Sequence, residues 1–230
     1  MTTEERIREL VRHFSGCLKH FETVDPFSAP MQYESHARSV ALRKKFSNAA
    51  EAVDSDEFLT SIRSTLVAWR MNQRGARLAE SAAFITAIRK WKREITQLEG
   101  ISLESAGEKD VDSVWRLVRA LEISTTYSKL VAGTKALHHL LPELVVPIDR
   151  DNTGWFLGRM PEQIQTPAQQ ENTFRVAFEA FVKISADAKP AEYVGTHRWH
   201  TSGTKVVDNA IVGYTKRVKQ KVWDSSLRSE

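Results

Sequence analysis

The stretch from residue 129 to 158, KLVAGTKALHHLLPELVVPIDRDNTGWFLG, concentrates the side chains best suited to chemistry. Lys135 lies in a short apolar segment that should be helical and should end near Pro142, because proline has no backbone N–H to continue a helix. Asp149 follows the apolar run Leu144 to Ile148 and precedes residue types that cap helices. We therefore expect Asp149 at the start of a new helix, where backbone N–H groups stabilise anions.

Several common chemistries are excluded by the absence of their motifs. The chain has no phosphate-binding glycine loop, dinucleotide fingerprint or HExxH pair. Its single cysteine, Cys17, excludes an intramolecular disulfide and a four-cysteine zinc or iron–sulfur site. His138 and His139 are adjacent, so their rings diverge on a helix and do not readily share a metal. The sequence therefore predicts no metal and no cofactor.

Two further segments combine aromatic, amide and basic side chains. The first is Trp69-Arg70-Met71-Asn72-Gln73-Arg74, which offers a flat surface for stacking, amides for reading base edges and guanidinium groups for phosphates. The second is the loop from Pro190 to Thr201, with His197, Arg198, Trp199 and His200. Both segments suit contacts to nucleic acid, but the first is also compatible with a helix end, and the second is better explained as a loop that braces the core.

The elements that position these residues are expected to be helices. Apolar residues recur at helical spacing, and there is no sustained alternating run and no internal repeat. The sequence predicts an all-α, multi-helix globular bundle formed by residues 1–230 as one domain, with a lobe boundary near residues 101–110. The principal helices are expected at 3–21, 32–53, 58–69, 80–98, 111–121, 129–141, 167–182 and 206–218.

Composition limits the partners and the compartment. The chain of 230 residues is 41% hydrophobic and 27% charged, with a net charge of +4 and a pI of about 9.2. This balance permits nucleic-acid binding without requiring it. No signal peptide opens the chain and no apolar run approaches the ~20 residues of a membrane span. We therefore expect a cytoplasmic protein that does not bind membranes.

The central stretch resembles the active-site region of the helix-hairpin-helix DNA glycosylase superfamily. Gly133 and Lys135 fall near that superfamily's hairpin and its lysine, and Asp149 matches its catalytic aspartate. The chain is similar to a divergent member, because its hairpin has a single glycine and its lysine-to-aspartate interval is short. The segments 69–76 and 204–210 are also similar to uncharacterised bacterial proteins.

The resemblance implies a hydrolase that flips a base out of DNA and cleaves its N-glycosidic bond. Cleavage builds positive charge on the sugar, which a fixed carboxylate stabilises. A divergent hairpin further suggests a hypermodified, phage-type base and a role in antiviral defence. The implied catalytic residues are Asp149 and Lys135, and the implied DNA contacts are Trp69, Arg70, Asn72, Gln73, Arg74, His138, Arg150, Asn152, Trp155, Arg198, Trp199 and Lys205.

Two other functions remain open on the sequence. In a non-catalytic DNA-binding protein, Asp149 would be a helix cap paired with Arg150 or another arginine. A helical interaction or immunity module would bind a protein partner and no nucleic acid. Composition does not separate these alternatives from the enzyme.

Overall fold

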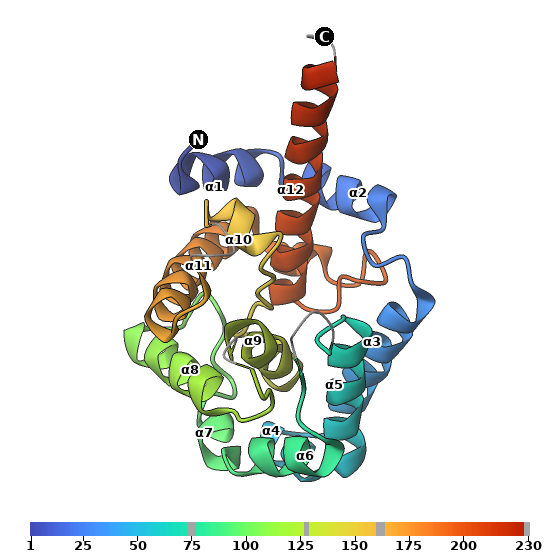
Figure 1. Cartoon of the computed structure of the whole chain (residues 1–230), viewed down its shortest axis with the longest axis vertical. Coiled ribbons are helices and arrows are strands. Elements are labelled where there is room, and N and C mark those ends of the chain that lie inside the picture. Colours follow the sequence, from blue (N-terminus) through green and yellow to red (C-terminus); the bar gives the residue numbers. More distant parts are fainter. Residues whose placement is uncertain (73–76, 127–128, 160–163, 228–230) are drawn as a thin grey trace.

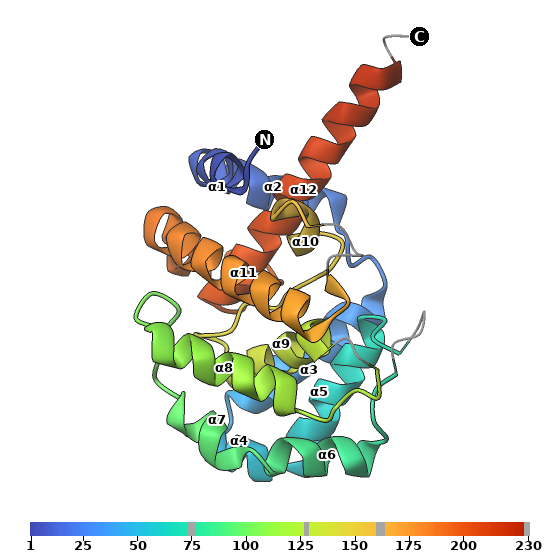
Figure 2. The ribbon, with the colours of Figure 1, turned by 60° about the vertical axis from the view of Figure 1, so that its left-hand side comes forward.

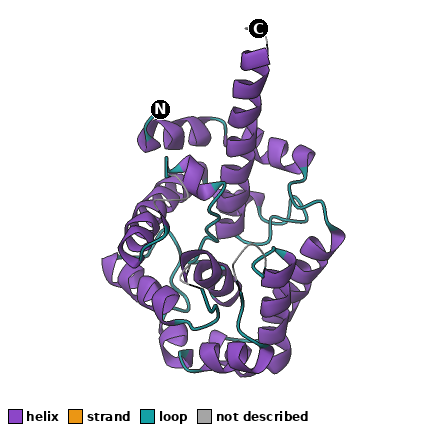
Figure 3. Cartoon of the chain, in the orientation of Figure 1, coloured by secondary structure: helices purple, strands orange, loops and turns teal. Residues whose placement is uncertain are grey.

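The computed structural model describes residues 1–72, 77–126, 129–159 and 164–227, and the side chains as far as residue 220. These residues form helices joined by loops and turns, with no strand among them (Figure 3). The predicted all-α bundle is thus confirmed. The helices are α1 (Thr3–Arg12), α2 (Phe14–Val24), α3 (Pro30–Arg43), α4 (Ala49–Asp54), α5 (Asp56–Ala68), α6 (Ser81–Arg89), α7 (Lys92–Gln97), α8 (Glu108–Ala120), α9 (Lys129–Leu140), α10 (Thr153–Phe156), α11 (Pro167–Ala188), the 3-10 helix η2 (Pro190–Tyr193) and α12 (Gly203–Leu227).

Helix α9 is the centre of the molecule. Every residue from Leu130 to Leu140 is buried, and α3, α5, α8 and α11 pack around the helix (Figure 1). A helix that is buried on all sides has no solvent-facing polar side, so its polar residues Thr134, Lys135 and His138 must find partners inside the protein. The closest approach is at Gly133, where an added Cβ would lie 3.1 Å from the backbone of Val118 in α8.

Three of the long helices expected from the sequence are each divided in two. The helix predicted over 3–21 breaks at His13 into α1 and α2, that over 32–53 becomes α3 and α4, and that over 80–98 becomes α6 and α7. The apolar periodicity continues across each break, but the main neighbours of the two halves differ. Helix α1 packs mainly on α11 and α2 on α12, α3 packs mainly on α5 and α4 on α7, and α6 packs mainly on α5 and α7 on α4. Tertiary packing, which periodicity does not report, sets these breaks.

Two other helix ends lie where proline and capping residues predict them. Helix α9 ends at Leu140, ahead of Pro142, as predicted. Helix α11 begins with Pro167 after the N-cap Thr166, whose hydroxyl accepts the backbone N–H of Gln169. Within the described residues, no helix is both long enough and apolar enough to cross a membrane.

The C-terminal helix α12 packs along α2 and then extends beyond the rest of the molecule (Figures 1 and 2). Its first half, from Val206 to Thr215, is wholly buried. Gly213 lies against the backbone of Cys17 in α2, so closely that a Cβ at this position would overlap the Cys17 carbonyl oxygen. The long helix thus joins the N-terminal helices to the segment that carries Asp149.

Candidate functional site

Lys135 and Asp149, predicted from sequence as the catalytic pair, meet in space. Lys135 Nζ lies 3.6 Å from Asp149 Oδ2. Lys135 is in α9, and Asp149 ends the buried extended segment 144–148 that runs beside this helix. The backbone N–H of Ile148 donates to the hydroxyl of Thr134 at 3.1 Å, which fixes Asp149 next to Lys135.

Asp149 is held by donors from the turn that leads into α10. Its Oδ1 accepts the backbone N–H groups of Asp151 and Asn152, both at 2.9 Å, and the side-chain amide of Asn152 at 3.0 Å. Burial by itself would raise the pKa of Asp149, but the Lys135 ammonium and these three N–H donors lower it below the usual value of 3.8. Asp149 is therefore an ionised carboxylate in a fixed orientation at neutral pH.

The pair opens into a cavity of about 610 Å³. Its wall combines flat aromatic faces, amide groups and exposed cations from segments far apart in the sequence. The lining residues are Pro26, Phe27, Ser28, Gln32, Trp69, Arg70, Met71, Thr126, Val131, Lys135, Asp149, Arg150, Asp151, Asn152, Lys216 and Lys219. The side chain of Asp149 is 32% exposed and that of Lys135 10% exposed, so the carboxylate is the more accessible of the two.

Arg70 reaches the cavity from a strained turn at the end of α5. Its φ is +62°, a left-handed conformation that residues with a Cβ rarely adopt. The turn is closed by hydrogen bonds from Arg70 N–H to the Val67 carbonyl and from Met71 N–H to the Leu66 carbonyl, both at 2.9 Å. Backbone strain of this kind is concentrated at functional sites, where the surrounding structure maintains it.

A buried cation supports the aromatic wall of the cavity, which is formed by Phe27 and Trp69. Lys205 is 1% exposed, and its Nζ donates to Asp208 Oδ2 at 2.5 Å and to Asn209 Oδ1 at 2.9 Å. The same ammonium lies 5.2–5.6 Å from the ring centroids of Phe27, Trp69 and Trp199. Lys205 therefore stabilises the positions of these aromatic rings from within the core, and it does not itself line the cavity.

Several other predicted contacts lie away from this cavity. Asn72 is exposed and its Oδ1 accepts the Leu78 N–H. Arg198 pairs with Asp25 at 2.9 Å, and Trp199 is fully buried. Trp155 contacts Arg6 and Lys219, so it lies beside the basic rim of the cavity, which consists of Arg70, Arg150, Lys216 and Lys219. Gln73 and Arg74 are outside the described residues.

His138 has a structural place. It is 2% exposed, and its Nδ1 donates to the Val145 carbonyl at 2.9 Å, which ties the extended segment to α9. Burial lowers the pKa of His138 to about 3, so the ring is neutral. Its contact holds the chain that carries Asp149, and it does not line the cavity.

Sequence reasoning missed residues that approach through tertiary contacts. Phe27 and Gln32 also line the cavity. Phe27 lies in the loop before α3, and Gln32 lies in the first turn of that helix. Lys216 and Lys219 come from α12, nearly two hundred residues after Phe27, and only the fold brings them to this cavity. Asp208 follows Lys205 by three residues, so the (i, i+3) spacing on a helix was an available signal for that buried pair.

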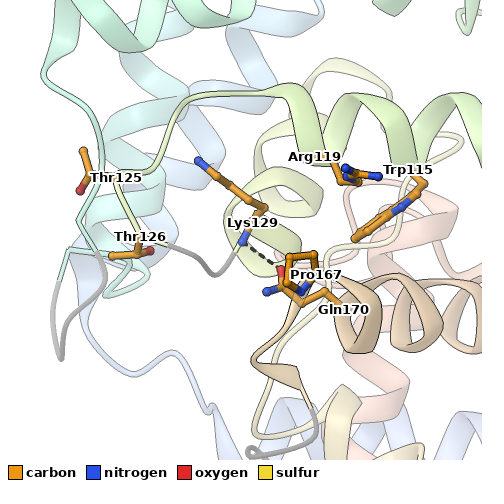
Figure 4. Close-up of a pocket in the computed structure, with 7 residues that line it drawn as sticks. All are labelled: Trp115, Arg119, Thr125, Thr126, Lys129, Pro167 and Gln170. Atoms are coloured by element: carbon orange, nitrogen blue, oxygen red, sulfur yellow. Dashed lines mark hydrogen bonds between the residues drawn. The ribbon is translucent and has the colours of Figure 1, made fainter.

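A second cavity, of about 400 Å³, lies between α8, α9 and the start of α11 (Figure 4). The side-chain oxygen of Gln170 accepts the backbone N–H groups of Lys129 and Leu130, both at 3.0 Å. Lys129 Nζ donates to the Ser124 carbonyl at 2.7 Å. These contacts satisfy the first turn of α9, so this cavity marks a structural junction.

The first cavity therefore combines an ionised carboxylate, a paired lysine, aromatic faces and a basic rim. Such a set suits an anionic ligand that carries a flat ring. Comparison with protein-family models, curated proteins and solved structures found no match to this chain.

Proposed function

We propose that this protein is a DNA glycosylase that hydrolyses the bond between a flipped-out base and its sugar. The observation that carries the proposal is the ion pair of Lys135 and Asp149 at a cavity with a basic rim. A negative charge is needed beside the sugar, and positive charges are needed along the phosphates. Both requirements are met within one cavity.

In this proposal, Asp149 acts on the sugar. As the C1′–N bond breaks, its electron pair leaves with the base, and positive charge develops at C1′ and the ring oxygen. The fixed carboxylate stabilises that charge and orients a water molecule toward C1′. The water oxygen bonds to C1′, its proton passes to Asp149, and the departing base takes up a proton from solvent. The products are the free base and an abasic site.

Lys135 has a supporting role in this scheme. Its ammonium pairs with Asp149, and an ammonium has no lone pair with which to attack C1′. The charge of Lys135 instead keeps Asp149 ionised and in place. The proposed reaction is therefore monofunctional, with base release and no strand cleavage.

The cavity wall provides groups for the DNA. Arg70, Arg150, Lys216 and Lys219 are exposed cations on the lining, suited to the phosphates on both sides of a flipped nucleotide. Phe27 and Trp69 form the aromatic part of the lining, against which a base can pack.

The volume of the cavity favours a large base. About 610 Å³ lies in the ~300–1,000 Å³ range of pockets for drug-sized ligands, so there is room for a base that carries an added group. We therefore extend the proposal to a hypermodified base such as those in phage DNA, with antiviral defence as the biological role. Selective action on ordinary damaged bases would contradict this extension.

The decisive experiment is base release measured by mass spectrometry. Purified protein is incubated with ordinary, uracil-containing, oxidised and phage-modified DNA, in single- and double-stranded form. We expect release of one class of base, and we expect Asp149→Asn to reduce its rate by at least ~10²–10³-fold, the cost of removing a preorganised charge. The matched control is Asp187→Asn, an exposed carboxylate in α11, which should keep the wild-type rate.

The same experiment decides the main alternative. Three N–H donors on Oδ1 are also what a purely structural aspartate at a turn would have. If no base is released from any substrate and the folded Asp149→Asn variant binds DNA as tightly as the wild type, the protein is a non-catalytic DNA-binding protein.

A further inference from the structure

Glu22, His197 and His200 form a compact cluster, and none of the three lines the candidate cavity. One ligand atom from each lies within 4.8 Å of the other two. Glu22 is near the end of α2, and both histidines are on the loop after η2, where His200 N–H donates to the His197 carbonyl at 2.9 Å. The cluster therefore joins two segments that are far apart in the sequence.

His200 is the residue that points to a ligand. Its side chain is 0% exposed, and its Nε2 has no hydrogen-bond partner among the described residues. The Glu22 carboxylate oxygen is 3.8 Å from that nitrogen, too far for a hydrogen bond. A buried polar atom without a partner is destabilising, so an additional group between the two atoms would stabilise the fold.

The other nitrogen of His200 is already oriented. Its Nδ1 lies 3.1 Å from the Thr196 hydroxyl, which fixes the ring so that Nε2 faces the carboxylate. Histidines that bind metals are typically held in this way through their second nitrogen.

We propose that Glu22, His197 and His200 bind a divalent transition-metal ion of the zinc class. Two imidazoles and one carboxylate are a ligand set that Zn²⁺ accepts, with water in the fourth position. Metal–ligand bonds of ~2.0–2.2 Å at tetrahedral angles put the ligand atoms about 3.3–3.6 Å apart. The observed separations of 3.8 Å and up to 4.8 Å need only small side-chain rotations to reach that spacing.

The surrounding charges are compatible with a cation. Lys205 is a buried ammonium that acts on His200, and it is paired with Asp208. The adjacent Arg198 is paired with Asp25. Both of these positive charges therefore have their own carboxylate, which leaves Glu22 for the metal.

The metal would stabilise the wall of the candidate site. Glu22 precedes the segment Pro26 to Ser28, which lines the cavity, and His200 follows Trp199, which packs on Phe27 with ring centroids 4.8 Å apart. The metal site does not depend on the proposed base-release chemistry, and it can be tested without DNA.

The test is metal binding by the tag-free, full-length protein after removal of metals with a chelator. We expect one equivalent of Zn²⁺ per chain by calorimetry, a Co²⁺ absorption spectrum typical of tetrahedral coordination, and a Tm that rises by about 5–10 °C at ~100-fold excess over Kd. No bound metal, together with the same Tm in chelator and in Zn²⁺, would overturn the proposal.

Variants test whether these three residues are the ligands. His197→Gln and Glu22→Gln remove ligands that are partly exposed, so these variants are expected to fold; each should weaken Zn²⁺ binding at least tenfold and abolish the Co²⁺ spectrum. The matched controls are the exposed His13→Gln and Glu34→Gln, which should bind like the wild type. Undiminished binding by both ligand variants would also overturn the assignment.

Discussion

At the scale of single residues, the role of Lys135 is the most informative question. Its Nζ contacts Asp149 at 3.6 Å and lies 5.6 Å from the ring centroid of Trp69. If its charge is what matters, Lys135→Arg should keep base release within about tenfold of wild type, whereas Lys135→Gln should reduce it by about 10–100-fold. The rate of base release under single-turnover conditions measures both effects.

Borohydride trapping distinguishes this charge role from nucleophilic attack. A lysine nucleophile forms an imine with the sugar, which borohydride reduces to a stable protein–DNA adduct. We expect no adduct with the wild-type protein, because the Lys135 ammonium is paired. An adduct that disappears in Lys135→Arg would show that Lys135 is the nucleophile.

At the scale of elements, the packing of α12 on α2 depends on one glycine. A Cβ at Gly213 would overlap the backbone carbonyl oxygen of Cys17, and backbone atoms cannot rotate away as a side chain does. We expect Gly213→Ala to lower the free energy of unfolding by about 3 kcal/mol or more, because the two helices must move apart. Chemical denaturation followed by circular dichroism measures this change.

Gly16, on α2, is the matched control. A Cβ there would meet only the end of the Arg217 side chain, at 3.7 Å. Alanine is favoured over glycine within a helix by about 0.5–1 kcal/mol, so Gly16→Ala should be neutral or stabilising. Equal destabilisation by the two substitutions would mean that the close approach at Gly213 does not decide the packing.

At the scale of the whole molecule, buried histidines should make the fold sensitive to acid. His36, His138 and His139 are buried together, and burial lowers the pKa of each below the usual 6.5. Below pH 6.5 the unfolded chain binds three protons that the folded chain does not. Stability is therefore complete above pH 6.5 and lost as the pH falls below it, by about 4 kcal/mol at pH 5.5 for three groups.

The number of protons taken up on unfolding provides the measurement. Denaturation curves recorded in chelator between pH 5 and pH 7.5 should give a slope equivalent to three protons or more at the acid end, because burial also lowers the pKa of His200, to about 4. His138→Asn should lower that number by about one, whatever its effect on stability, and the exposed His13→Gln should not lower it. A slope of one proton or fewer would contradict the prediction.

The sequence by itself determined the helical class, the end of α9 before Pro142 and the start of α11 at Pro167, because these depend on periodicity and on proline and capping chemistry within a few residues. It also predicted Lys135 and Asp149 as candidate site residues, since both lie in one short stretch of unusual composition.

Only the tertiary structure decided which distant groups join that pair. The breaks at His13 and between α3 and α4 separate halves whose main packing partners differ, which the spacing of apolar residues does not record. Phe27 and Lys219 reach one cavity from opposite ends of the chain, and Glu22 meets His200 in the same way. Their proximity follows from how the helices pack around α9, and no local pattern in the sequence specifies it.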